Sequence, residues 1–170
     1  MGKTPITPSS LNLHLFMSTS PASPTIINSR VLPYPRAQVF GAFQNPEILA
    51  QWWGPNGFTN TFDEFDFRPG GMWRFTMHAP TGAAFPNVSR FVEVEAPSRI
   101  VFHHEDPVHW FEMVMTYENV PADGGADANT RLTWRMTFAT VEEAENLRAF
   151  ITDANEQNLG RLEACLKGMG

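Results

Sequence analysis

Residues 130–166 read TRLTWRMTFATVEEAENLRAFITDANEQNLGRLEACL, and two periodicities meet in this stretch. Up to Thr140, apolar and polar side chains alternate, which is typical of a strand with one buried and one solvated face in an antiparallel sheet. Beyond Thr140, apolar residues recur every three or four positions, which predicts a helix of about 25 residues. Thr140 is a suitable N-cap, and Glu142 and Glu143 complement the helix dipole in the first turn. We therefore expect an α+β protein in which a strand leads directly into a long C-terminal helix.

Further strands are expected upstream, because short alternating segments are separated by turn sequences. The predicted strands are 58–67, 71–78, 87–95, 99–105 and 110–119. The segment Arg68-Pro69-Gly70-Gly71 predicts a tight turn and not a phosphate-binding loop, because it lacks the spacing of such a loop and precedes a strand. Residues 122–129 predict a small polar hairpin loop.

The N-terminal part of this region predicts one strand and two short helices. Residues 25–32 form the strand, and the helices are separated at Asn45-Pro46 because proline disfavours the helical conformation in the preceding residue. The second helix ends at Gly54-Pro55 and carries Trp52 and Trp53 at adjacent positions, about 100° apart. One indole is therefore expected in the core, and the other acts either as a lid over a pocket or as a plug that holds the helix to the sheet.

The first 24 residues differ in composition from the remainder, being rich in Thr, Ser and Pro. They are interpreted either as an added leader or as an arm. Leu11, Leu13 and Leu15 alternate with polar residues, so an arm could add a short strand to its own sheet or to a neighbouring copy's. We expect a single domain over residues 25–168. A homodimer, joined by sheet edges or by the arm, is an open alternative.

Composition excludes several classes of protein. The chain has 170 residues and a net charge of −6, from 12 basic and 18 acidic residues, so nucleic acid is not an expected partner. No apolar run approaches the roughly 18 residues of a membrane helix, so no membrane partner is expected. A single cysteine, Cys165, forms no internal disulfide and no thiolate metal cluster, which favours the cytoplasm.

Bulky apolar residues are abundant, with 14 Phe, 5 Trp and 8 Met. This composition suits either a thick core or an apolar pocket, and it does not choose between them.

Specific motifs add a family resemblance to this layout. They are Gln51-Trp52-Trp53-Gly54-Pro55, Phe58-Thr59, and the segments 65–75 (FDFRPGGMWRF), 93–102 (EVEAPSRIVF) and 130–134 (TRLTW). Together these motifs resemble the family named after the activator of the 90-kDa heat-shock protein ATPase (AHSA-like). That family belongs to the START/Bet v-like superfamily, also called SRPBCC or polyketide cyclase-like. The resemblance implies a helix-grip fold, in which a curved antiparallel sheet of six to seven strands wraps round the C-terminal helix.

The resemblance also implies a function, because members of the superfamily bind apolar small molecules between helix and sheet. We therefore expect a small, mainly hydrophobic ligand and no cofactor. Strand parity and the resemblance together predict a pocket lined by Trp53, Trp73, Phe75, Phe91, His103, Met113, Met115, Trp134, Met136, Phe150 and Asn158. His103 is placed in this set because it shares parity with Val101.

Two polar features bear on this pocket. Asn155 and Asn158 interrupt the apolar face of the long helix, and a buried amide without a partner costs about 1–3 kcal/mol. A ligand, a water or a nearby carbonyl could satisfy them. The charged residues Arg74, Glu93 and Glu112 are expected on the solvated face of the sheet.

Two other functions remain open. A cyclase or hydratase-like enzyme acting on an aromatic or polyketide-like substrate needs a cavity histidine or carboxylate with a shifted pKa, and no catalytic residue is assigned. A co-chaperone-like interaction module predicts a filled core and an exposed apolar patch.

No metal site is expected. The nearest set is His103, His104, Glu105, Asp106 and His109, but consecutive strand residues point to opposite faces of a sheet.

Overall fold

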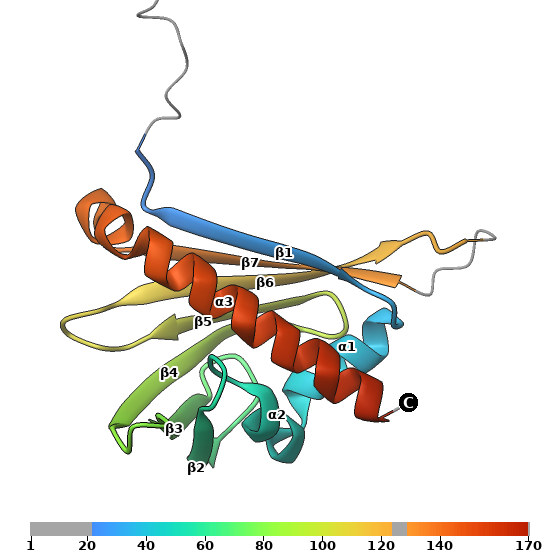
Figure 1. Ribbon diagram of the computed structural model, residues 1–170, viewed down its shortest axis with the longest axis horizontal. Coiled ribbons are helices and arrows are strands. Elements are labelled where there is room, and N and C mark those ends of the chain that lie inside the picture. Colours follow the sequence, from blue (N-terminus) through green and yellow to red (C-terminus); the bar gives the residue numbers. More distant parts are fainter. Residues whose placement is uncertain (1–21, 124–128, 170) are drawn as a thin grey trace, which may run out of the picture.

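A seven-stranded antiparallel sheet curves round one long helix in the computed structural model, which describes residues 22–123 and 129–169 (Figure 1). The predicted arm, apart from its last three residues, and most of the predicted loop 122–129 lie outside the described residues. In chain order the elements are β1 (Thr25–Leu32), α1 (Arg36–Gln44), α2 (Pro46–Trp52), β2 (Thr59–Phe65), β3 (Met72–His78), β4 (Ala84–Glu95), β5 (Arg99–His104), β6 (Phe111–Val120), β7 (Asn129–Phe138) and α3 (Val141–Met169).

The strand order is β1-β7-β6-β5-β4-β3-β2, with antiparallel pairing throughout. Helices α1 and α2 carry the chain from β1 at one edge of the sheet to β2 at the other. Helix α3 crosses one face of the sheet, as Figure 1 shows. The predicted α+β helix-grip fold is confirmed.

Most element boundaries lie within two residues of those expected, and the start of β4 and the end of α3 differ most. Strand β4 begins at Ala84 instead of residue 87, because Ala84 and Phe85 pair with His78 and Met77 of β3 and so extend the ladder. Helix α3 has 29 residues and continues to Met169, past the predicted end. The basic Lys167 in its last turn complements the helix dipole there.

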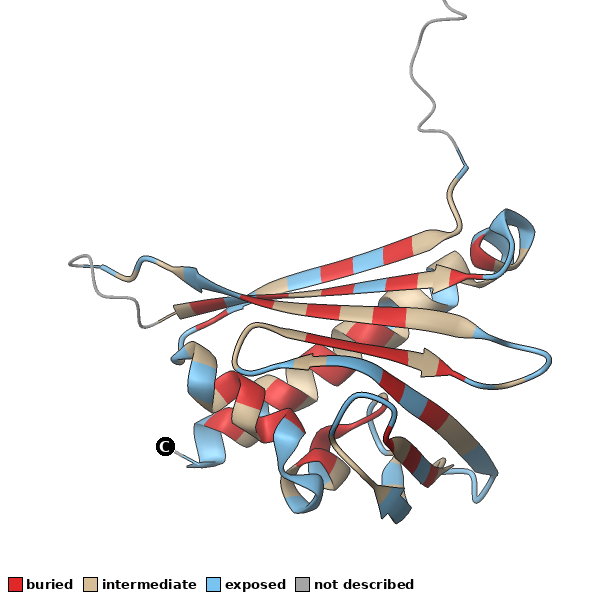
Figure 2. Ribbon diagram, turned by 180° about the vertical axis from the view of Figure 1, so that it is seen from behind, coloured by how far each residue is buried: buried red, intermediate tan, exposed pale blue. Residues whose placement is uncertain are grey.

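Buried residues of α3 and of the sheet form the core between them (Figure 2). This core is rich in aromatic side chains. On β7, the alternation predicted for the sequence holds, with Leu132, Trp134 and Met136 buried. Trp52 belongs to this core, and its indole Nε1 donates to the carbonyl of Ala42 at 3.0 Å.

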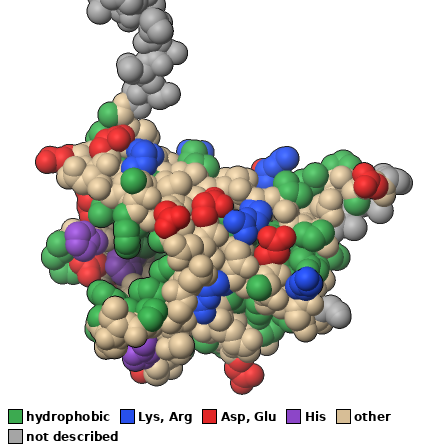
Figure 3. Space-filling model, in the orientation of Figure 1, with side chains coloured by type: hydrophobic (Ala, Val, Ile, Leu, Met, Phe, Trp, Pro, Cys, Tyr) green, Lys and Arg blue, Asp and Glu red, His purple; other side chains and the backbone are tan. Residues whose placement is uncertain are grey.

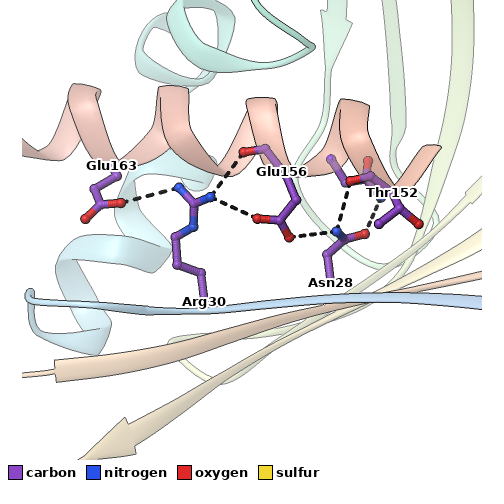
Figure 4. A network of polar contacts seen from close by, with 6 residues as sticks. Asn28, Arg30, Thr152, Glu156 and Glu163 are labelled. Atoms are coloured by element: carbon purple, nitrogen blue, oxygen red, sulfur yellow. Dashed lines mark hydrogen bonds and ion pairs between the residues drawn. The ribbon is translucent and has the colours of Figure 1, made fainter. Parts of the chain in front are cut away.

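Polar contacts fix α3 to the edge strand β1 (Figure 4). Asn28 Nδ2 donates to Glu156 Oε1 at 2.8 Å and to the carbonyl of Thr152 at 3.2 Å. Arg30 reaches Glu156 at 3.0 Å and Glu163 at 3.4 Å. The hydrogen bond from Asn28, together with Arg30, holds the pKa of Glu156 below its ordinary value. These contacts fix the register of the helix against the sheet.

The opposite face of the sheet carries ion pairs between neighbouring strands. Arg74 lies 3.0 Å from Glu64, and Arg99 lies 2.7 Å from Glu93. Glu112 Oε2 accepts a hydrogen bond from His103 Nε2 at 2.8 Å. The three charged residues assigned to this face by sequence are therefore found there.

The turn before β3 depends on Gly71. A Cβ on Gly71 would lie 1.9 Å from the carbonyl oxygen of Asp66, and Gly70 has a φ of +84°. The segment is a tight turn, as predicted. Among the described residues no helix, α3 included, combines the length and hydropathy needed to cross a bilayer.

Candidate functional site

A cavity of about 190 Å³ lies between α3 and the sheet. Figure 3 shows this face of the molecule hollowed between hydrophobic side chains, with histidine side chains beside and inside the hollow. The residues that line the cavity are Trp53, Gly54, Pro55, Trp73, Phe75, Met77, Asn87, Ser89, Phe102, His104, Phe111, Met113, Trp134, Met136, Ile151, Ala154, Asn155 and Asn158. None of these described residues is an Asp, Glu, Lys or Arg.

Trp53 forms the wall at the end of α2. Its ring centroid lies 5.2 Å from that of Trp73 and 5.4 Å from that of Trp134. The chain turns away at Gly54, whose φ of +98° is unfavourable for other residues. Trp53 therefore packs against indoles of β3 and β7 on the inner face of the sheet and lines the cavity. Its neighbour Trp52 is buried in the core and does not line the cavity.

Arg161 of α3 holds this wall in place. Its guanidinium donates to the carbonyls of Gln51, Trp53, Gly54, Pro55 and Phe58, at 2.9 to 3.1 Å. Burial lowers the pKa of Arg161. Sequence reasoning missed this residue, because a single arginine in a helix shows no periodic signal for a contact with backbone carbonyls.

Three buried polar atoms of the cavity lining have no hydrogen-bond partner among the described residues. They are Asn158 Oδ1 and the indole Nε1 atoms of Trp73 and Trp134. Asn158 is 5% exposed, and both tryptophans are fully buried. Each unpartnered atom costs about 1–3 kcal/mol. The lining is thus mainly apolar, and its unpartnered buried atoms are one acceptor and two donors.

Asn155, one turn before Asn158, is satisfied. Its Nδ2 donates to Asn28 Oδ1 at 3.1 Å and to the sulfur of Met136 at 3.2 Å. Both amide hydrogens are therefore used, which fixes the orientation of the side chain. The two asparagines were expected on the inward face of the helix, and both are buried there.

His104 is the histidine that lines the cavity. It is 9% exposed and stacks on Phe111 with ring centroids 4.8 Å apart. Burial, the largest influence on it, lowers its pKa from the ordinary value of 6.5. The imidazole is therefore neutral at pH 7.

The placement of His103 in the cavity was wrong. His103 lies on the opposite face of β5, where it contacts Glu112 at 2.8 Å and Trp110 at 5.2 Å between ring centroids. The prediction used Val101 as an inward marker, yet Val101 is buried outside the core between helix and sheet, to which Ile100 and Phe102 belong.

The other predicted lining residues divide into three groups. The cavity brings together Trp53, Trp73, Phe75, Met113, Trp134, Met136 and Asn158. Phe91 and Met115 are fully buried but pack in the core without lining the cavity. Phe150 is 70% exposed and lines a neighbouring groove, because Ile151, 100° further round the helix, takes the inward position.

No group of three or more His, Cys, Asp or Glu side chains is placed to hold a metal ion within the described ranges. The cavity can enclose a small molecule, and indole, amide and imidazole side chains stand in its wall.

A curved antiparallel sheet that grips a long helix, with an apolar cavity between them, defines a helix-grip protein. The chain belongs to the family of Activator of Hsp90 ATPase homolog 1-like proteins, which it matches over residues 33–167. No sequence among curated proteins matches it.

Solved structures share this fold at low sequence identity. A protein from Arthrobacter aurescens is 19% identical, with a TM-score of 0.76 over 86% of this chain and 87% of that one. A protein from Nitrosomonas europaea is 23% identical, with a TM-score of 0.73 over 86% and 96%. The AHSA1 protein from Silicibacter pomeroyi is 17% identical, with a TM-score of 0.69 over 86% and 99%. At these identities the likeness concerns the fold alone.

Proposed function

We propose that this protein reversibly binds one small, uncharged and mainly apolar molecule in the cavity between α3 and the sheet. The observation that carries the proposal is an apolar wall with unpartnered buried polar atoms, above all Asn158 Oδ1. The cavity, at about 190 Å³, slightly exceeds the roughly 150 Å³ of an engineered apolar cavity that takes up benzene. One aromatic ring with a few further atoms matches this size.

The absence of charged side chains from the described lining restricts the ligand. An ion transferred into such a cavity loses its hydration and gains no counter-charge, which costs far more than the transfer of a neutral polar group. Carboxylates and ammonium compounds are therefore excluded as ligands of this site.

The unpartnered atoms restrict the ligand's polar group. Asn158 Oδ1 needs a donor, and the indole nitrogens of Trp73 and Trp134 need an acceptor. A hydroxyl both donates and accepts, so a phenol supplies what these atoms lack within a neutral molecule. Toluene has nearly the same shape and supplies neither.

The test is isothermal titration calorimetry with phenol, toluene and benzoate. We expect one phenol per chain, bound about tenfold more tightly than toluene, since one net hydrogen bond corresponds to about that factor. Benzoate should not bind. Failure of both phenol and toluene to bind would contradict the proposal.

The variant Asn158→Leu separates binding from polar recognition. Leucine has a similar volume, so toluene should still bind while the preference for phenol is lost. Because the substitution removes an unpartnered amide oxygen, we also expect the unliganded variant to be more stable by about 1–3 kcal/mol. Asn146→Leu, at an exposed position of the same helix, is the matched control and should keep the wild-type preference.

A second candidate, an enzyme that moves a proton, is favoured by one observation: His104 is a neutral imidazole in the cavity wall. Such a group can take a proton from carbon beside a carbonyl and return it. The test is exchange of the methyl hydrogens of acetophenone into heavy water, followed by NMR. Exchange that His104→Phe abolishes would support an enzyme, and exchange at the rate of buffer would reject it.

A further inference from the structure

A groove of about 340 Å³ lies next to the cavity, on the same side of the molecule. Its lining consists of Pro55, Asn56, Phe58, Ala79, Pro80, Thr81, Phe150, Asp153, Ala154 and Gln157. Pro55 and Ala154 also line the cavity, so the two spaces share a wall of small side chains. A ligand that fills the cavity and extends past Pro55 and Ala154 enters this groove.

One side of the groove is apolar and comes from three separate segments. Phe150 of α3 is 70% exposed, and Phe58 pairs with Phe85, itself 51% exposed, with ring centroids 6.4 Å apart. Pro80 adds to the same side. Single exposed apolar residues are common, but a concentration of them beside a cavity indicates a binding surface.

The other side of the groove is polar and internally bonded. The backbone N–H of Asn56 donates to Gln157 Oε1 at 3.1 Å, and Gln157 Nε2 donates to Asp153 Oδ2 at 2.9 Å. These bonds tie the loop after α2 to α3. Asp153, the one charged residue of the groove lining within the described part of the chain, is thereby engaged at the exposed rim of the groove.

We propose that the cavity and this groove form one two-part site, whose ligand has a neutral phenol-like head and an apolar tail. The inference rests on the proposed function, because the head occupies the cavity described above. The tail lies against Phe58, Pro80 and Phe150. Together the two spaces reach the volume of about 300–1,000 Å³ that is usual for small-molecule sites, whereas the cavity alone does not.

The proposed position of the tail predicts how affinity changes with tail length. A fully buried methylene contributes about a fourfold gain in affinity, and an open groove buries each methylene only in part. Affinity should therefore rise about two- to fourfold for each methylene added to the para position of phenol, from 4-ethylphenol to 4-hexylphenol.

Isothermal titration calorimetry of this series on the wild type and on Phe150→Ser tests the two-part site. We expect the variant to bind phenol as the wild type does but to lose most of the gain per methylene. Phe150→Leu should restore it. Val141→Ser, another exposed apolar position on α3 that is not among the residues lining the groove, is the matched control and should keep the full gain.

The outcomes separate the two proposals. Phenol binding with no gain from the tail, or with the same gain in Phe150→Ser, would overturn the two-part site and leave the proposed function intact. If neither phenol nor any alkylphenol binds, both proposals are wrong. Because Phe150 is exposed, its replacement does not endanger folding, and circular dichroism checks this.

Discussion

His104 is a titratable side chain held in an apolar wall, and its surroundings decide its charge. It stacks on Phe111 and lies opposite Ser89 of β4 in the sheet. Burial outweighs the opposing influence of Asp106, so the pKa is lowered. A neutral ring is compatible with an uncharged ligand, whereas a protonated ring would place an unpaired charge in the cavity wall.

This shift makes stability depend on pH. As the pH falls below about 6.5, the unfolded chain takes up a proton at residue 104 before the folded chain does, so the free energy of unfolding decreases. The loss continues, by up to about 1.4 kcal/mol per pH unit, until the pH reaches the lower pKa of the folded state. Urea unfolding between about pH 7.5 and pH 5 should show a weaker pH dependence for His104→Phe than for the wild type. Equal slopes would contradict this explanation.

Asn155 and Asn158 line the same wall of the cavity but differ in their hydrogen-bond partners. Both project from α3 toward the sheet, but only Asn155 meets a partner amide, that of Asn28, and the sulfur of Met136. Asn155 therefore anchors the helix, whereas Asn158 Oδ1 has no hydrogen-bond partner among the described residues.

At the scale of elements, α3 is attached at both sides by polar groups. Toward β1 it is held by Glu156 and Glu163, and toward the loop after α2 by Arg161. Its apolar residues fill the space between these attachments. The helix is thus positioned by directional bonds as well as by burial, which keeps the cavity at a defined width.

Arg161→Met tests the second attachment. The variant removes the donor for the five carbonyls between residues 51 and 58 to which Arg161 is bonded. We therefore expect the free energy of unfolding to fall by about 2–4 kcal/mol. Trp53 loses its support in the same change, so phenol affinity should also fall. Urea denaturation and calorimetry measure the two effects.

Arg74→Met is the matched control, because Arg74 forms its ion pair with Glu64 at 3.0 Å on the solvated face of the sheet. This variant should leave the free energy of unfolding and the affinity for phenol nearly unchanged. A loss after Arg161→Met no larger than in this control would show that the carbonyls find other partners.

At the scale of the whole molecule, the two faces of the sheet are stabilised by different interactions. One face is mainly apolar and aromatic, and it is free of charged side chains where the described residues line the cavity. The other carries cross-strand ion pairs, including Arg90 with Glu105 at 2.7 Å and Arg131 with Glu118 at 3.9 Å. Exposed pairs of this kind contribute about 0–1 kcal/mol each.

Salt should therefore have little effect on stability. We expect the free energy of unfolding to change by less than about 1 kcal/mol between low salt and about 1 M NaCl, because screening removes only weak attractions and also reduces repulsion within an acidic protein. Urea denaturation at both salt concentrations checks this. A loss of several kcal/mol would place the ion pairs among the main sources of stability.

The order of elements was predictable from sequence, because the periods of strand and helix are clear and turn residues separate them. Strands β6 and β7 show this best, since Met113 and Trp134 were expected inward and are buried. Strand β5 was harder: Ile100, Val101 and Phe102 are all buried, so its two faces cannot be told apart by hydrophobicity. For this reason the sequence prediction placed His103 in the cavity, where the structure has His104.

The candidate site was predictable only in part. On α3, Phe150 and Ile151 are equally apolar neighbours, and the sequence does not show which one faces the sheet. The unpartnered state of Asn158 depends on where other chain segments place their carbonyls and amides. Such positions are set by the assembled fold and not by local pattern.

The grip of Arg161 on main-chain carbonyls has a consequence for how this protein can change. Every residue type carries a carbonyl, so the attachment does not depend on which side chains stand at Pro55 or Phe58. Those two positions, which line the groove, can therefore accumulate substitutions while the loop stays fixed. Natural drift or a directed library at these two positions would therefore vary the surface of the groove, while Arg161 keeps the backbone of the loop in place.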